Sequence, residues 1–261
     1  MELSRVRIEI DKGVAVLTLN DPAVMNAAGE PMLDDILAAM DVVEDEASGV
    51  RCLVITGAGT AFCSGANLRD RGSGKAKPVG IVLETHWHPL LRRLRRLHCP
   101  VITAVNGAAA GGGMALALTG DIVIAARSAY FLQAFRRIGL APDVGSTWLL
   151  PRRIGVARAM ELSLLGEKLP AEKALAWGLI NRVVDDGAAL DEAMKVAREL
   201  SEGPTKALGL IRGLYWDSTE NNFEEQLDLE FRTQRMAGAT ADFREGVAAF
   251  LETRAAKFRG K

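Results

Sequence analysis

Three short apolar runs, two of them preceded by segments of helical periodicity, constrain the fold of this chain more than any other feature. The runs are Val50–Thr56, Val101–Val105 and Asp121–Ala126, each short enough for a buried strand. Residues 31–43 and 81–97 precede the first two runs and carry apolar side chains at helical spacing. Helices that alternate with buried strands are typical of β-α-β units. The sequence therefore predicts an α/β fold.

Local signals refine this picture at the N-terminal end. A hairpin is expected from Val6–Ile10 and Val14–Leu19, which flank a Gly-bearing turn. The polar, Gly-rich segment 69–78 predicts a mobile loop. Within the helix 81–97 we expect a kink at Pro89, because proline removes a helical hydrogen bond.

The C-terminal part of the chain has a different character. From Ala157 onward nearly everything except a short strand at Leu179–Val184 has helical periodicity. This part is therefore expected to be a helical appendage to the α/β part. The predicted helices are 157–165, 171–177, 190–200, 205–216, 223–236 and 241–253.

Composition excludes several classes of protein. With 32 Lys and Arg against 33 Asp and Glu, the chain lacks the basic excess that nucleic-acid binding needs. The three cysteines form no C-x-x-C pair, which favours a reduced, intracellular protein. The first residues do not resemble a signal peptide, and no run of about 18 apolar residues could span a bilayer. We therefore expect a cytoplasmic protein with no nucleic-acid or membrane partner.

Several known functional motifs are only partly matched by this sequence. Phe62 occupies the place of the third glycine in a dinucleotide fingerprint, and Arg69 that of the first glycine in a phosphate loop. His86 and His88 diverge by about 200° on a helix, so they make a poor metal site. Ser64 has Phe62 where a nucleophile elbow requires glycine. We expect no metal, and serine hydrolysis is only a minor alternative.

Two glycine turns remain as candidates for chemistry. Ser64–Ala66 and Gly111–Gly113 each lie beyond the exit of a buried strand. If they face one another, their amides could form an oxyanion hole, a pair of N–H donors for a carbonyl that gains negative charge. Spacing alone equally allows two tight turns that only pack a helix against a sheet.

Asp143 is the candidate acid–base residue, and its role also has two interpretations. It precedes the apolar stretch Trp148–Leu150, and residue preference alone favours a helix N-cap. The functional interpretation is a carboxyl group in an apolar pocket, where burial raises its pKa into a useful range for proton transfer.

Five segments carry a family resemblance, namely Thr18–Asn20, Asn26-Ala27, Gly57–Leu68, Val105–Gly107 and Ala110–Gly113. Together they resemble the enoyl-CoA hydratase/isomerase (crotonase) family, over essentially the whole chain. The resemblance implies a crotonase-like spiral β-β-α core, here 1–200, and a C-terminal helical trimerisation region, 201–261. It also implies coenzyme A thioester substrates, no separate cofactor, and a homo-oligomer that is a trimer or a dimer of trimers.

The resemblance assigns roles to individual positions. The amides of Ala66 and Gly112 would form the oxyanion hole for a thioester enolate. Asn67 replaces the Asp that is usual in the most similar branch of the family. Contacts with coenzyme A would come from Met25, Ala27, Ala61, Ser64, Gly65, Asn67 and Leu68.

Two departures favour isomerisation over hydration. Ala115 and Phe135 stand where hydratases of this family carry glutamates that handle water. The segment 139–152 resembles the branch that isomerises the ring-epoxide of phenylacetyl-CoA to an oxepin and shifts double bonds, and Asp143 matches its catalytic acid. Phe135 and Trp87 are candidate acyl contacts. The alternatives are an enoyl-CoA hydratase (lyase) of fatty-acid or aromatic acyl-CoA degradation and a non-catalytic acyl-CoA-binding protein.

Overall fold

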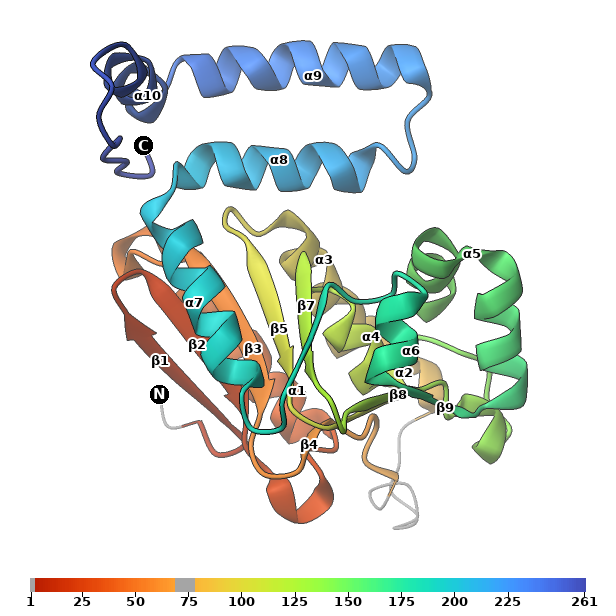
Figure 1. Cartoon of the computed structure of the whole chain (residues 1–261). Helices are drawn as coiled ribbons and strands as arrows, with labels where there is room; N and C mark the ends of the chain where they lie inside the picture. Colours follow the sequence, from red (N-terminus) through yellow and green to blue (C-terminus); the bar gives the residue numbers. More distant parts are fainter. Residues whose placement is uncertain (1–2, 69–77) are drawn as a thin grey trace.

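The computed structural model describes residues 3–68 and 78–261, and its strands form two sheets (Figure 1). The predicted loop at 69–78 lies, except for Pro78, outside the described residues. The larger sheet has the order β1 (Val6–Asp11), β2 (Val14–Leu19), β3 (Cys52–Gly57), β5 (Val101–Val105), β7 (Ile122–Ala126) and β10 (Arg182–Val184). The smaller has the order β4 (Ala61–Cys63), β6 (Ala108–Ala110), β8 (Tyr130–Leu132) and β9 (Lys168–Pro170).

The larger sheet confirms the α/β prediction. Its first two strands form the expected antiparallel hairpin, and β2, β3, β5, β7 and β10 then pair in parallel. Every residue of β5 is buried, as its largely apolar sequence predicts, and the hydroxyl of Thr103 donates to the carbonyl oxygen of Ala117. Helix α7 (Ala189–Glu202) crosses one face of the sheet and contacts β3, β5 and β7 (Figure 1).

The strands of the smaller sheet were not expected from hydrophobic periodicity, although the family resemblance implied a β-β-α core. Its strands have three residues each, too short for a periodicity, and the sequence predicts only the glycine turns Ser64–Ala66 and Gly111–Gly113 next to two of them. Each of β4, β6 and β8 follows a strand of the larger sheet after a short connection and is followed by a helix. The chain thus repeats a β-β-α unit, which is the spiral that the resemblance implied.

Helices of the described residues follow the predicted order, with α8 and α9 lying side by side above the core (Figure 1). None of them is long and apolar enough to cross a membrane. Besides α7, they are α1 (Glu30–Glu44), α2 (Val79–Val82), the π-helical turn η4 (Leu83–Trp87), α3 (His88–Arg96), α4 (Gly112–Ala117), α5 (Ser146–Leu165), α6 (Ala171–Ala176), α8 (Thr205–Asp217), α9 (Phe223–Gly238) and α10 (Ala241–Leu251), with short 3-10 turns η1 (Pro22–Val24), η2 (Glu46–Ser48) and η5 (Phe135–Ile138).

Two helices differ from expectation. The irregularity predicted at Pro89 lies one turn earlier, in η4, because Pro89 has no N–H to donate to the carbonyl of Thr85. Helix α5 begins at Ser146 rather than Ala157 and is broken inside by Gly155, whose φ is 78° and ψ is 158°. The division of the chain at residue 200 stays a prediction.

Arg212 fastens the C-terminal helices to the core. Its guanidinium is buried and donates hydrogen bonds to the carbonyl oxygens of Leu94, at 3.0 Å, and Leu97, at 2.6 Å. It also forms an ion pair with the carboxylate of Asp121. One side chain of α8 therefore binds the C-terminal end of α3 and the start of β7.

Replacing Arg212 with Met is expected to lower the free energy of unfolding by about 3–5 kcal/mol, because Asp121 loses its ion-pair partner and two carbonyl groups each lose a hydrogen bond. Denaturant unfolding measures this change. The control is Arg127→Met, which removes an exposed ion pair with Glu172 and should cost less than about 1 kcal/mol. Equal losses in the two variants would contradict the role given to Arg212.

Candidate active site

The two glycine turns meet in the structure. A Cβ atom placed on Gly65 would lie 2.8 Å from the carbonyl oxygen of Ala110 and 3.5 Å from the amide nitrogen of Gly112. Gly65 also has a φ of 93°, which L side chains rarely adopt. A Cβ on Gly113 would lie only 2.2 Å from the carbonyl oxygen of Cys63, so the turns also pack tightly. The two turns therefore face one another and also pack closely, whereas the spacing of the glycines alone left these as alternatives.

The backbone amides at this junction are suited to bind an anion. Gly112 is the first residue of α4, and amides in the first turn of a helix have no acceptor within it. Ala66 directly follows Gly65 and is exposed. In the part of the chain that the structure describes, neither amide donates to a protein acceptor. Two such donors side by side can stabilise a carbonyl oxygen that becomes negative.

Apolar side chains surround the Gly112 position. A Cβ placed there would lie 3.2 Å from Cζ2 of Trp87 and 3.3 Å from Cγ2 of Val144. One placed on Gly111 would lie 3.7 Å from Cζ of Phe135. All three side chains are buried. The two aromatic residues that we expected to contact the acyl group thus lie at the start of α4.

The segment that carries Asp143 lies at the same place. Its neighbour Val144 contacts the Gly112 position, and successive Cα atoms are only about 3.8 Å apart. The N-cap of α5 is Gly145, so the N-cap interpretation of Asp143 is wrong. Instead, the carbonyl oxygen of Asp143 accepts a hydrogen bond from the Ser146 amide at 2.9 Å, which closes a tight turn. Asp143 itself is half-buried.

The residues expected to contact coenzyme A form two adjacent segments. The Ser64 amide donates to the Met25 carbonyl oxygen at 3.0 Å, and the Ala28 amide to that of Gly65 at 2.7 Å. The Ser64 hydroxyl also donates to Val24, at 3.3 Å. By exposure, Met25, Ala66 and Leu68 are open to solvent, Ala27, Ser64 and Asn67 are half-buried, and Ala61 and Gly65 are buried.

Asn26 supports these segments, a role that we did not assign from the sequence. It is fully buried, and its side-chain amide donates to the carbonyl oxygens of Ala58, at 2.9 Å, and Ala61, at 2.8 Å. Its side-chain oxygen accepts from the Asp21 amide at 2.9 Å. The only sequence signal is its place in the quoted motif Asn26-Ala27, since a short polar residue in a loop has many other uses.

Cys63 lies directly beneath the glycine turns and is not a reactive thiol. Burial raises its pKa from 9.0 to about 11, although amides of Gly65 and Ala28 stabilise the thiolate. Burial likewise raises the pKa of Cys99 to about 12, and that of Cys52 further. All three thiols are buried and free.

We expect the native protein not to react with DTNB at about pH 8, and all three thiols to react after unfolding. Absorbance of the released thiolate measures both. The free energy of unfolding should also fall as pH rises from 9.0 towards 11, because the unfolded Cys63 loses its proton before the buried one does. Rapid modification of native thiols would contradict this prediction.

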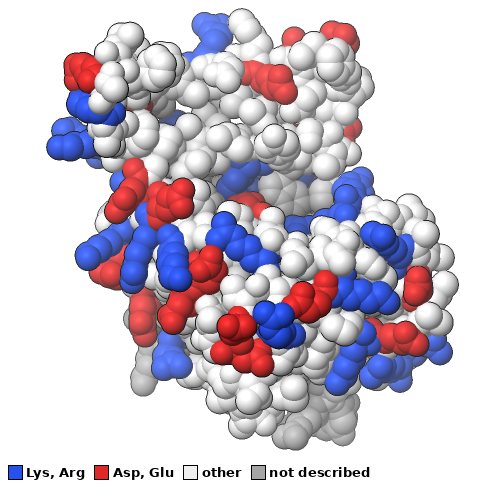
Figure 2. All heavy atoms as spheres, viewed as in Figure 1, with Lys and Arg blue, Asp and Glu red and all other residues white. Residues whose placement is uncertain are grey.

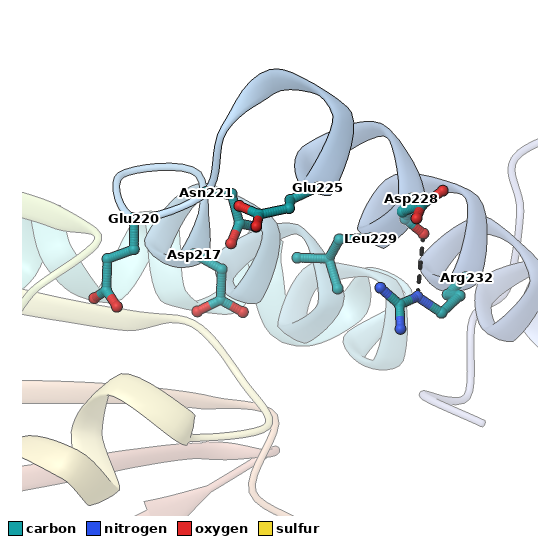
Figure 3. A pocket seen from close by; sticks show the side chains of 7 residues that line it. All are labelled: Asp217, Glu220, Asn221, Glu225, Asp228, Leu229 and Arg232. Carbon is teal, nitrogen blue, oxygen red and sulfur yellow. Dashed lines mark hydrogen bonds between the residues drawn. The ribbon is translucent and has the colours of Figure 1, made fainter.

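A pocket at the junction of α8 and α9 is unsuited to coenzyme A (Figure 3). Its volume is about 320 Å³, and carboxylates dominate its lining, so it would repel the phosphates of coenzyme A. The α8–α9 pair lies apart from α4 in the fold (Figure 1). The lining residues are Asp217, Glu220, Asn221, Glu225, Asp228, Leu229 and Arg232.

Comparisons with known proteins identify the family. The family described as Enoyl-CoA hydratase/isomerase matches residues 9–261. The chain is 50% identical, over 97% of both sequences, to "1,2-epoxyphenylacetyl-CoA isomerase" of Escherichia coli (strain K12). It is 45% identical, over the whole of both, to "Probable enoyl-CoA hydratase" of Rhodobacter capsulatus. A crystal structure of an enoyl-CoA hydratase from Polaromonas sp. JS666 superposes with a TM-score of 0.91 at 33% identity, covering 97% of this chain and 99% of that one. The chain therefore belongs to the enoyl-CoA hydratase/isomerase family.

Proposed function

We propose that this chain is an acyl-CoA isomerase in which Asp143 is the acid–base group and the amides of Ala66 and Gly112 form the oxyanion hole. One observation carries the proposal: Gly112 lies close both to Gly65 and to Val144, the neighbour of Asp143. This proximity supports a single site that combines a proton-transfer group with two polarising donors. The named isomerase at 50% identity supports the same reaction class.

The proposed reaction moves one proton within the substrate. The Asp143 carboxylate removes a proton from a carbon of the acyl chain, and the electron pair moves onto the thioester oxygen, where the two amides stabilise it. The resulting enolate takes the proton back from Asp143 at another carbon, and the double bond shifts. With the ring-epoxide of phenylacetyl-CoA, Asp143 would assist ring opening instead, to give the oxepin.

The walls of the site favour isomerisation over hydration. Ala115 and Phe135 are buried and carry no group that could activate water. Trp87 and Phe135 pack at the start of α4, where they would exclude water from an enolate. Coenzyme A enters as part of the substrate, held along the adjacent segments around Met25 and Ser64. The proposal involves no separate cofactor and no metal.

Mass spectrometry of products that have first been separated by chromatography tests the proposal. The purified protein is mixed in turn with a trans-2-enoyl-CoA, a 3-enoyl-CoA and the phenylacetyl-CoA epoxide. An isobaric product from either of the last two supports the isomerase. A product heavier by one water, with loss of the conjugated-thioester absorbance of crotonyl-CoA, would establish a hydratase instead. Binding without turnover of any substrate would establish an acyl-CoA-binding protein.

We also propose that the C-terminal helices join copies of this chain into a trimer or a dimer of trimers. Phe223, Leu227 and Phe231 are exposed at successive four-residue intervals, which places them on one face of α9. Phe250 on α10 is 84% exposed. Charged residues of both signs cover the core, whereas much of the C-terminal region is uncharged in Figure 2. Exposed apolar patches of this kind mark interfaces.

Light scattering of the purified protein at micromolar concentration tests the assembly. A trimer or hexamer is expected, and a monomer would overturn this part of the proposal. The cytoplasmic location expected from the sequence stays a prediction.

A further inference from the structure

Val144 has a backbone conformation that its side chain disfavours. Its φ is 51°, in the left-handed region, where a β-branched residue is a genuine outlier. Gly145 follows with a φ of 75°, and the Ser146 amide donates to the Asp143 carbonyl oxygen at 2.9 Å. Both central residues of this tight turn are thus left-handed, a geometry that normally selects Asn or Gly at the first of them.

Packing against the start of α4 accompanies this conformation. The Val144 side chain is 2% exposed, and its Cγ2 atom lies 3.3 Å from where a Cβ of Gly112 would be. The Ser146 hydroxyl is buried and has no hydrogen-bond partner among the described residues, so it adds nothing to the turn. A strained residue persists only where its surroundings hold it, and such residues cluster at functional sites.

A second turn has the same strained conformation but lies at the surface. Lys12 has a φ of 48° and Gly13 a φ of 79°, in the connection between β1 and β2. Lys12 is exposed, whereas Val144 is buried against the candidate oxyanion hole. The two turns share a conformation and differ in what the first residue contacts.

We propose that Val144 is a positioning residue: its side chain, packed on Gly112, holds the strained turn against α4 and thereby fixes Asp143 relative to the oxyanion hole. The inference rests on the proposed function, because it concerns where the acid–base group is held. Val144 would set the rate of proton transfer without donating or accepting a proton.

The test compares three variants with the parent in the isomerisation of a 3-enoyl-CoA, together with calorimetric binding of a saturated acyl-CoA. Val144→Gly suits the left-handed backbone but removes the contact with Gly112. We expect its kcat to fall on the order of 100-fold, since a misplacement of about 1 Å has that effect, with KM and acyl-CoA affinity within about twofold. Its Tm should stay within about 4 °C of the parent, because relief of strain offsets lost burial.

Two further variants separate positioning from stability. Val144→Thr keeps the branched shape and should retain kcat within about threefold of the parent. Lys12→Gly relieves the same backbone conformation at the distant turn and should leave kcat unchanged. If Val144→Gly does not fold, Val144→Ala replaces it in the same comparison.

The outcomes distinguish this inference from the proposed function. Parent-like kcat in Val144→Gly, or a rise in KM that accounts for its loss of activity, overturns the positioning role. Loss of kcat in Val144→Thr equal to that in Val144→Gly also overturns it. If the parent isomerises nothing, or if Asp143→Asn still does, the proposed function itself fails.

Discussion

Asp143→Asn is expected to lower kcat for double-bond isomerisation by about 100- to 10,000-fold, the contribution typical of a general acid–base group. Asn has nearly the same shape but cannot take up and return a proton under these conditions. The contacts proposed for coenzyme A lie on other segments, around Met25 and Ser64, so acyl-CoA affinity should change little. The assay follows the rise in conjugated-thioester absorbance from a 3-enoyl-CoA, and calorimetry measures binding.

Asp185→Asn is the matched control. Asp185 is exposed and forms an ion pair with Arg127 away from the glycine turns, so the same chemical change there should leave kcat unaltered. Near-parental turnover by Asp143→Asn would move the acid–base role to another group. Loss of both turnover and binding would instead show that Asp143 supports the structure of the site.

Gly65→Ala is expected to lower kcat/KM by about 100- to 1,000-fold, the usual effect of losing one donor of an oxyanion hole. The new Cβ would lie 2.8 Å from the carbonyl oxygen of Ala110, closer than real Cβ atoms approach, so the backbone must move. The atoms that move include the adjacent Ala66 amide. Activity with a 3-enoyl-CoA and thermal unfolding are measured together.

Gly49→Ala controls for the backbone strain itself. Gly49 has a φ of 66°, but a Cβ there meets no atom within 4 Å. Each variant puts alanine in the left-handed region, at a cost of about 1–2 kcal/mol, whereas only Gly65→Ala adds a clash at the site. Equal activities in the two variants would remove Gly65 and Ala66 from the proposed oxyanion hole.

Features set by local sequence were predictable. The strand Val101–Val105 has the predicted bounds, because a buried strand in a parallel sheet is a continuous apolar run. Helices α8 and α9 begin at the predicted residues Thr205 and Phe223, since an amphipathic period is a strong signal over many residues. The family and the α/β class followed from motifs and element order.

Features set by contacts between distant segments were not predictable from the residues alone. That Gly65 faces Gly112 depends on how β4 and β6 pair in the smaller sheet, which neither local motif encodes. The three-residue strands of the second sheet are held by their neighbours and have no periodicity of their own. Asp143 shows the limit of residue preference, because Gly145 rather than Asp143 caps α5.

In the proposed site, backbone amides polarise the substrate, whereas side chains move protons and line the acyl pocket. The proposed donors of the oxyanion hole, at Ala66 and Gly112, are main-chain amides, which every amino acid except proline supplies. Substitution can therefore replace the groups that move protons or line the acyl pocket, such as Asp143 and Phe135, without removing the polarising groups. A fold of this kind can acquire a new reaction when a few side chains are exchanged around an unchanged pair of backbone donors.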